Sequence, residues 1–264
     1  MRHLLSLLFL AALPAQAAVV KHYFHVQSGT GFFVNNGDLL TNEHVVRGCR
    51  EVILKGPHYP ETKATVRATD LQHDLALIQS PTPPHSIALL RENIEDLRPG
   101  DPVILFGYPG GAWKTGAYKM SQAALVSTQG TPKHPEWIEF SDAAARGNSG
   151  GPLVDRSGNV IGIVVAIVYT QKTLYEVNKV SGEKKLLKTT KTTTDSAIGL
   201  AAAEDFMHSY SVDFRYNPSM ILLTDENIEH TVADYLVNVQ CRTPISEAEA
   251  AAMPGEAAQE DQLP

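Results

Sequence analysis

The sequence has little of three things: cysteine, basic charge and long apolar runs. Its 264 residues include only 2 cysteines, and 22 basic residues are outnumbered by 29 acidic ones, so the net charge is −7. A net negative charge gives no reason to expect a nucleic-acid-binding protein. Two distant cysteines without clustered histidines do not make a zinc site, so we expect no metal.

The apolar run that stands out lies at the N-terminus. After the polar start Arg2-His3, residues 4–13 form an apolar run with one serine in it, which is too short a stretch to cross a bilayer. Ala15-Gln16-Ala17 then has the pattern of a signal-peptide cleavage site. We predict that residues 1–17 are a secretory signal peptide and that the mature, exported chain starts near Ala18 without stable membrane insertion. A membrane anchor or a buried helix is the competing interpretation.

Export bears on the two cysteines, Cys49 and Cys241. An oxidising compartment, either the periplasm or the medium, allows one disulfide between them. Such a bridge would tie the predicted C-terminal helix to the loop just after His44. The sequence leaves open whether the two cysteines are bridged or are free and buried.

Long helical periods are missing from residue 18 to about residue 169. Short apolar runs broken by Gly, Pro, Asn and Asp fill this region, a pattern typical of an all-β sandwich or barrel. A fold of alternating strands and crossover helices would need about a dozen helical residues between strands. The absence of such stretches argues against that class of fold. The loop-rich stretch from Pro81 to Gly100 is interpreted as the crossover between two barrel halves, about 18–95 and 96–205.

Three later segments have different patterns. Residues 171–195, rich in lysine and threonine, predict a hairpin or loop that projects from the body and turns at Ser181-Gly182; it is either a polar surface insertion or a substrate-gating loop. Apolar side chains at helical spacing over Glu226–Gln240 predict a C-terminal helix, within a helical segment of about 204–242. Residues 243–264 are rich in alanine and glutamate and predict a disordered acidic tail.

The stretch from Gly147 to Pro152 places one hydroxyl, that of Ser149, in a run of small, turn-permissive residues. Glycine lets the backbone turn sharply and lets a substrate come close. A serine in such a turn is a nucleophile when a base reaches it, and neighbouring N–H groups can converge on an oxyanion. An ordinary glycine-rich turn between strands is the alternative, so the partners of the serine decide the interpretation.

Two upstream residues are suitable partners. His44 stands at the end of a strand-like run, where a catalytic base would lie on a rigid edge. Asp74 heads an otherwise apolar strand, so its carboxylate needs a partner, and an imidazole N–H is a suitable one. A structural histidine and a strand-capping aspartate are the alternatives. Asp70 is the weaker candidate acid because it lies in a polar loop.

Thr41-Asn-Glu-His44-Val-Val, Asp74-Leu-Ala-Leu and Gly147-Asn-Ser-Gly-Gly-Pro152 together resemble the three signature blocks of chymotrypsin-fold serine proteases. The resemblance is closest to the HtrA/DegP-like branch and extends over roughly Ser28 to Tyr210. It implies an all-β fold of two six-stranded antiparallel β-barrels with a C-terminal helix. The trypsin-like protease domain would occupy residues 18–242.

The resemblance further implies a serine endopeptidase that cleaves polypeptides through an acyl-enzyme and needs no metal or organic cofactor. Ser149 would be the nucleophile, His44 the general base and Asp74 the residue that orients His44. The N–H groups of Gly147 and Ser149, with Asn148 between them, would form the oxyanion hole. The substrate pocket would be uncharged and would favour small or medium aliphatic P1 residues; its lining would be Ala143, Ala144, Ala145, Ala166 and Ile167.

Two other interpretations stay open. Gly147–Gly151 also matches the nucleophile elbow of α/β-hydrolases, but the residues after Pro152 predict a strand where that fold needs a helix. A catalytically silent binding or chaperone-like protein could keep the whole triad.

The chain also departs from the HtrA pattern in three ways. Few residues follow Tyr210, too few for a PDZ domain. The Asp142–Ser149 segment is about one residue short, and residues 171–195 have no obvious counterpart.

Overall fold

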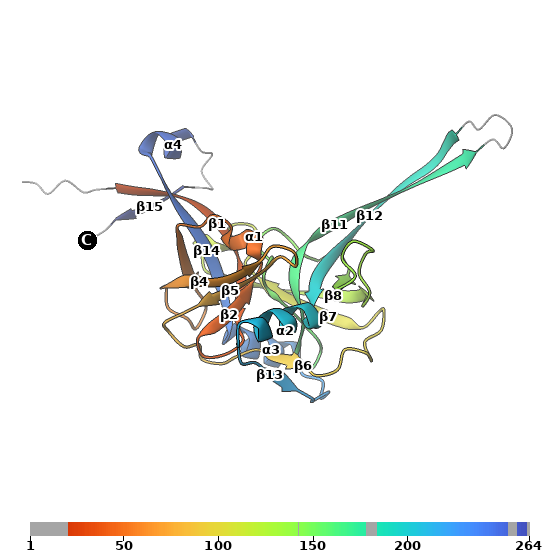
Figure 1. The fold of residues 1–264 in the computed structure, drawn as a ribbon, viewed down its shortest axis with the longest axis horizontal. Coiled ribbons are helices and arrows are strands. Elements are labelled where there is room, and N and C mark those ends of the chain that lie inside the picture. The colour runs from red at the N-terminus through yellow and green to blue at the C-terminus, as the bar shows by residue number, and fades with distance from the viewer. Residues whose placement is uncertain (1–20, 142, 178–183, 253–257, 263–264) are drawn as a thin grey trace, which may run out of the picture.

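Most of the chain folds into two barrels of antiparallel strands (Figure 1). The computed structural model describes residues 21–141, 143–177, 184–252 and 258–262. The predicted signal peptide, residues 1–17, and the predicted turn at Ser181-Gly182 lie outside the described residues. Among the helices of the described part, none is long and apolar enough to span a membrane.

The first barrel has six strands, and one of them comes from far along the chain. Pairing of the first and last strands in the sheet, with Gly29 opposite Val239, closes the barrel. Closure removes the unpaired edges that an open sheet would expose. In sheet order the strands are β1 (Lys21–Phe33), β2 (Asp38–Thr41), β5 (Leu75–Gln79), β4 (Thr62–Asp70), β3 (Glu51–Lys55) and β14 (Leu236–Ile245).

The second barrel also has six strands and closes where Leu153 pairs with Gly162. Two short parallel strands, β6 (Leu89–Arg91) and β13 (Arg215–Asn217), extend the sheet from one of its strands. The predicted all-β double barrel is therefore confirmed. In sheet order the barrel strands are β10 (Pro152–Val154), β7 (Pro102–Gly107), β8 (Lys119–Ser127), β9 (Trp137–Phe140), β12 (Lys184–Gly199) and β11 (Val160–Val177).

The division of the chain between the barrels differs from the predicted halves, 18–95 and 96–205. The strand β14 returns to the first barrel, and β6 joins the sheet of the second.

The predicted helix Glu226–Gln240 is helical only over α3 (Asp225–Ala233). From Leu236 onward the chain is a buried strand, because Val237, Val239 and Cys241 alternate with polar residues at the two-residue period of a strand.

The predicted disordered tail, 243–264, has structure in its described parts. The helix α4 (Glu247–Ala252) follows β14, and β15 (Ala258–Gln262) pairs with β1. The hydroxyl of Ser246 accepts from the N–H of Glu249, while the Glu249 carboxylate accepts from the N–H of Ser246 at 2.8 Å. This reciprocal pair is a capping box. An alanine- and glutamate-rich stretch is also a good helix former, which outweighs its disorder-like composition.

The strands β11 and β12 form a hairpin that projects far from the barrels, as predicted for residues 171–195 (Figure 1). Their register runs from Gly162 opposite Gly199 to Val177 opposite Lys184. The hairpin therefore begins inside the second barrel and continues beyond it. The remaining helical elements are short: α1 (Glu43–Val46), the 3₁₀ turn η1 (Ala112–Lys114) and α2 (Leu200–Ser209).

One buried apolar cluster includes side chains of both barrels, among them Phe32 and Leu40 of the first and Phe106 and Ile163 of the second. The shared core fixes one barrel against the other, because displacing them would expose this apolar surface. Val45, next to His44, and Leu75, next to Asp74, belong to this core.

Candidate active site

His44 and Asp74 are in direct contact. His44 lies in α1, the single helical turn after β2, and Asp74 immediately precedes β5. The Nδ1 atom of His44 is 2.7 Å from Oδ2 of Asp74, and the backbone N–H of His44 donates to Oδ1 at 2.9 Å. The carbonyl of Asp74 accepts from the N–H of Glu43 and from the side chain of Asn42. These bonds fix both the ring and the carboxylate.

The backbone of Asp74 adopts a left-handed conformation, with φ of 55°. Aspartate tolerates this region better than most residues because its short polar side chain can form local hydrogen bonds. The sharp turn aims the carboxylate back at α1.

Asp70, the weaker candidate acid, pairs with a different histidine. Its Oδ2 atom is 2.6 Å from Nδ1 of His73. Burial acts to raise the pKa of Asp70, but hydrogen bonds from the side chain and backbone of His73 and from the N–H of Gln72 outweigh it, so the pKa lies below its ordinary value. Asp74, and not Asp70, is therefore the carboxylate that reaches His44.

Ser149 lies in a tight turn before β10, and two glycines in this turn have left-handed backbones. Gly147 has φ of +101° and Gly150 has φ of +84°. A Cβ atom on Gly147 would lie 2.2 Å from the carbonyl oxygen of Tyr108, and one on Gly150 would lie 2.2 Å from that of Thr30. Only glycine fits at either position, which explains the composition of the motif.

The serine turn packs against the segment that carries His44. A Cβ atom on Gly150 would lie 2.2 Å from Oγ1 of Thr41, three residues before His44. One on Gly29 would lie 2.6 Å from Cγ2 of Val45 and 3.0 Å from the carbonyl oxygen of Ser149. The fold thus brings the backbone of Ser149 next to the chain on both sides of His44.

The hydroxyl of Ser149 donates to the carbonyl oxygen of Val165 at 2.8 Å. Val165 lies at the point where the register between β11 and β12 shifts. No hydrogen bond joins Ser149 to His44 among the described residues. The serine and the histidine are neighbours in the fold, and the serine hydroxyl is turned toward β11.

Two N–H groups beside Ser149 have no acceptor among the described residues: those of Gly147 and of Ser149 itself. The carbonyl of Arg146 accepts from the N–H of Gly110 at 3.0 Å. Because a trans peptide directs its C=O and N–H in opposite directions, the N–H of Gly147 points away from Gly110. Paired donors without a protein acceptor are what an oxyanion hole requires.

Asn148 lies between these two donors. Its N–H donates to the carbonyl of Ala145 at 3.0 Å, and its side chain is buried. The residue is therefore a spacer between the two unoccupied donors, because its own donor is used to close the turn.

Thr30, to which the sequence analysis gave no role, joins the first barrel to the serine turn. Its hydroxyl donates to the carbonyl of Gly147 at 2.6 Å and accepts from the N–H of Tyr108 at 3.1 Å. Its N–H donates to the carbonyl of Ser149 at 2.8 Å. No local pattern of the sequence around Thr30 shows what its hydroxyl contacts.

Two of the predicted pocket alanines contact a buried carboxylate. The N–H groups of Ala143 and Ala144 donate to Oδ2 of Asp195 at 2.6 and 2.5 Å, and Asp195 is completely buried. Ala143 and Ala144 are partly buried, and Ala145 is exposed. The sequence analysis gave Asp195 no role of its own, because it is the last residue of the polar, insertion-like stretch 171–195. Only the fold brings it to the alanine loop.

The other two predicted pocket residues, Ala166 and Ile167, lie on β11. Their backbones pair with those of Ser196 and Asp195 on β12. The strand pairing therefore places both next to the residue that binds the alanine loop.

Cys49 and Cys241 form a disulfide, with their Cα atoms 5.2 Å apart. Cys49 follows α1, and Cys241 lies in β14 rather than in the expected helix. The bridge ties the C-terminal strand of the first barrel to the loop after His44.

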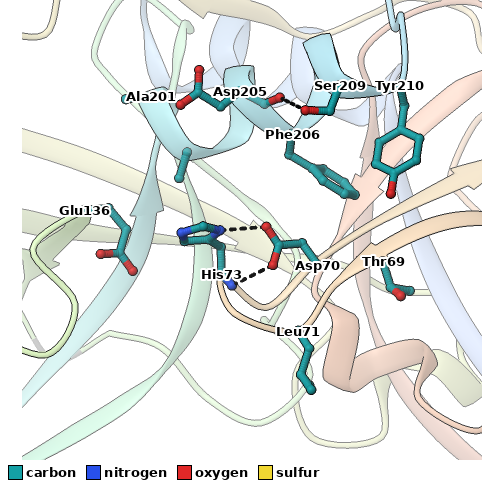
Figure 2. A pocket seen from close by; sticks show the side chains of 11 residues that line it. Thr69, Asp70, Leu71, His73, Glu136, Ala201, Asp205, Phe206, Ser209 and Tyr210 are labelled. Carbon is teal, nitrogen blue, oxygen red and sulfur yellow. Dashed lines mark hydrogen bonds and ion pairs between the residues drawn. The ribbon is translucent and has the colours of Figure 1, made fainter.

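A separate cavity of about 590 Å³ lies between the turn after β4 and the helix α2 (Figure 2). Asp70 and His73 face it from one side, and Asp205 and Phe206 from the other. Its lining includes none of the three residues of the expected triad. The substrate site is therefore argued from the surroundings of Ser149 and not from this cavity.

The fold, the histidine–aspartate pair and the glycine-flanked serine define a chymotrypsin-like protease scaffold. Residues 29–163, which contain all three, match the trypsin-like peptidase domain family, and the chain belongs to that family. The match ends before β12, which supplies Asp195, and before β14, which closes the first barrel.

Similar proteins include named HtrA-type serine proteases. The chain is 33% identical over 145 residues to a probable periplasmic serine protease do/HhoA-like of Haemophilus influenzae, covering 53% of this chain and 31% of that protein. It is 30% identical over 148 residues to the periplasmic serine endoprotease DegP of Escherichia coli K12, covering 56% and 31%. The match thus spans about a third of the length of these relatives.

Solved structures show the same fold. The HtrA-type protease AlgW with a decapeptide superposes with a TM-score of 0.54 at 22% identity, over 72% of this chain and 63% of that chain. The active form of the Rv3671c protease of M. tuberculosis gives a TM-score of 0.52 at 21% identity, over 78% and 86%.

Proposed function

We propose that the chain is an exported serine endopeptidase that uses Ser149, His44 and Asp74 as a catalytic triad. The contact between Nδ1 of His44 and Asp74 carries the proposal, because it lies beside a serine turn with two unoccupied N–H donors. Membership of the trypsin-like peptidase domain family supports the same chemistry.

In the proposed mechanism the Ser149 hydroxyl turns from Val165 toward Nε2 of His44. As Oγ attacks the peptide carbonyl carbon, His44 takes its proton, and Asp74 holds the Nδ1–H tautomer and stabilises the imidazolium. The N–H groups of Gly147 and Ser149 would bind the oxyanion. His44 then protonates the leaving amine, which leaves an ester on Ser149.

Water completes the cycle. His44 removes a proton from the water as its oxygen attacks the ester carbonyl, and returns the proton to Oγ of Ser149 as the carboxylic acid product leaves. The proton taken from Ser149 leaves with the amine product, and a proton of the water replaces it, so the proposed chemistry consumes only the peptide and water.

We propose polypeptide substrates with small or medium aliphatic P1 residues. HtrA-type proteases of the same fold have been solved with bound peptides. The loop from Ala143 to Ala145 has no charged side chain, and the Asp195 carboxylate next to it is already hydrogen-bonded by two N–H groups. Peptide libraries should therefore show cleavage after Ala, Val or Leu; selective cleavage after Lys or Arg would contradict this P1 preference.

Export is proposed from the signal-peptide pattern of residues 1–17. The Cys49–Cys241 disulfide and the periplasmic relatives support it, since disulfides persist in oxidising compartments. N-terminal sequencing of the exported protein should begin near Ala18.

Labelling with a serine-directed fluorophosphonate tests the triad. The wild-type chain should react at Ser149, and Ser149→Ala and His44→Ala should not react. Ser209→Ala and His208→Ala are matched controls, because both side chains are exposed and belong to α2; they should label like wild type.

A second function, a catalytically silent binding or chaperone-like protein, is favoured by one observation. The Ser149 hydroxyl is bonded to Val165 and not to His44. A folded wild-type chain that takes no label and cleaves neither unfolded nor native proteins would overturn the endopeptidase proposal in favour of this one.

A further inference from the structure

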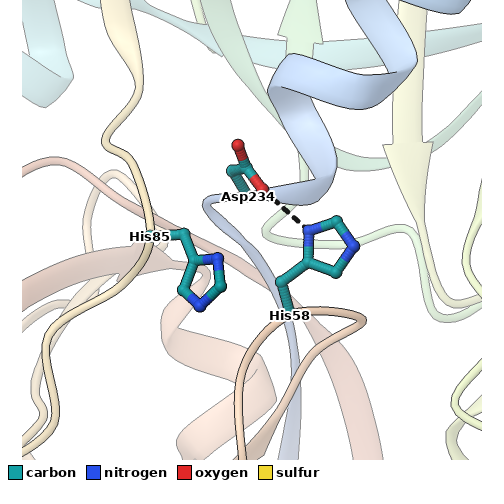
Figure 3. A group of neighbouring side chains, drawn as sticks. All are labelled: His58, His85 and Asp234. Carbon is teal, nitrogen blue, oxygen red and sulfur yellow. Dashed lines mark hydrogen bonds and ion pairs between the residues drawn. The ribbon is translucent and has the colours of Figure 1, made fainter.

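Three side chains that can bind metal meet at the start of β14, although they are far apart in sequence (Figure 3). His58 lies in the loop between β3 and β4, His85 lies in the segment between β5 and β6, and Asp234 follows α3. One ligand atom of each lies within 4.8 Å of those of the other two.

The group is centred on His58. Its Nδ1 atom is 2.7 Å from Oδ1 of Asp234, and its ring stacks on that of His85 with the centroids 5.8 Å apart. His230, on the last turn of α3, has its ring centroid 6.4 Å from that of His58. Three imidazoles and one carboxylate are thus gathered at one place on the surface.

The backbone beneath the group is well fixed. The hydroxyl of Tyr59, a buried residue, donates to the carbonyl of Thr82 at 2.7 Å, which joins the His58 loop to the segment that carries His85. A Cβ atom on Gly56 would lie 2.6 Å from the carbonyl oxygen of Leu236, so the same loop also packs closely on β14 just after Asp234. The three ligands therefore come from segments that are already held together.

The contacts within the protein do not use all the ligand atoms of this group. An exposed histidine–aspartate pair contributes little to stability. Apart from its stacking on His58, His85 has no hydrogen bond or ion pair among the described residues. Two adjacent imidazoles would repel each other when both are protonated, and both become ligands when neutral.

Neutral imidazole and carboxylate are preferred ligands of Zn²⁺ and of related first-row divalent ions. Tetrahedral Zn²⁺ with bonds of about 2.0–2.1 Å places its ligand atoms about 3.3 Å apart. Small rotations of half-exposed side chains would bring the three atoms to that spacing, and the side chains of His58 and Asp234 are 43% and 24% exposed.

We propose that His58, His85 and Asp234 bind one Zn²⁺-like divalent ion, with His230 or water as the fourth ligand. The ion would join the segment between the barrels to the C-terminal strand of the first barrel. None of the contacts of these residues involves His44, Asp74 or Ser149, so the site is a structural one and is independent of the proposed catalytic chemistry.

Isothermal titration of ZnCl₂ into the metal-free full chain, without a polyhistidine tag, tests the site. One ion per chain should bind at pH 7.5, and thermal unfolding should shift upward with Zn²⁺. His85→Ala should weaken binding at least tenfold while it leaves the metal-free fold intact, because His85 makes no hydrogen bond among the described residues that the substitution would break. His58→Ala and Asp234→Asn should weaken it as well.

His208→Ala is the matched control, since this exposed histidine lies outside the group, and its binding isotherm should equal that of wild type. Binding should also weaken as the solution is acidified, because the ligands must be deprotonated to bind the ion. Absence of Zn²⁺ binding by wild type, or equal binding by wild type and His85→Ala, would overturn the proposal. Both readouts are independent of peptidase activity.

Discussion

Thr30 joins the two barrels by hydrogen bonds next to the turn that carries Ser149. Its hydroxyl contacts Gly147 and Tyr108, and its carbonyl accepts from the hydroxyl of Thr41 at 2.6 Å. We expect Thr30→Val to lower the free energy of unfolding by about 1–3 kcal/mol, because it leaves the partly buried carbonyl of Gly147 and the buried N–H of Tyr108 without partners.

The same substitution should slow fluorophosphonate labelling of Ser149 at least tenfold, since the carbonyl of Gly147 would lose the bond that positions its peptide. Urea unfolding and labelling rates measure the two effects. Thr30→Ser keeps the hydroxyl and should remain close to wild type in the labelling rate. Equal labelling of the valine and serine variants would refute the positioning role of Thr30.

At the scale of single residues, the sequence predicted those candidate site residues that stand in recognisable local motifs. His44, Asp74 and Ser149 each stand in a recognisable block, and the structure brings His44 and Asp74 into contact and the Ser149 backbone next to the segment that carries His44. Thr30 and Asp195 were not assigned roles because their partners lie far away along the chain. No local pattern encodes such contacts.

Among the elements, β6 is held to the turn between β10 and β11 by a buried ion pair. The side chains of Arg91 and Asp155 are 6% and 5% exposed, and Nη1 lies 2.5 Å from Oδ2. Asp155 also accepts from the N–H groups of Ser157 and Asn159, which shape the turn.

We predict that Arg91→Met lowers the free energy of unfolding by about 3–5 kcal/mol, because it leaves a buried carboxylate without its countercharge. Arg98→Met is the control: the hydrogen bonds of Arg98 lie near the surface, and its loss should cost less than about 1 kcal/mol. Urea denaturation followed by circular dichroism compares the two. Equal effects would contradict a special role for the buried pair.

The sequence predicts whether an element is a helix or a strand where its apolar side chains follow one period, as in the short strands of the barrels. Over Glu226–Gln240 two periods overlap: Ile228 and Val232 follow a helix, whereas Val237 and Val239 alternate as in a strand. The pairing of β14 with β1 and β3 decides between them, and that pairing is a tertiary contact. The capping box at Ser246 is a local signal for α4, but a prediction made from the composition of the tail did not use it.

For the whole molecule, the Cys49–Cys241 disulfide closes a very long loop, with a sequence separation of 192. Cross-links of this kind stabilise chiefly by restricting the unfolded chain. We predict that the Cys49→Ser/Cys241→Ser double variant lowers the free energy of unfolding by about 2–5 kcal/mol. Wild type in reducing buffer should unfold at the same urea concentration as the double variant. An unchanged midpoint in both would show that the bridge contributes nothing to stability.

The closure of the first barrel by β14 has a consequence for the order of events during synthesis. A ribosome delivers β1 to β5 long before it delivers Leu236, and the contact between Ser28 and Asn238 spans 210 residues. Until then β1 and β3 keep open edges, and the loop after His44 lacks its disulfide partner. Pairing over such separations forms late. If Ser149 is the proposed nucleophile, a nascent chain would therefore carry it well before the first barrel closes, and any cleavage would begin only after Leu236–Ile245 has been synthesised.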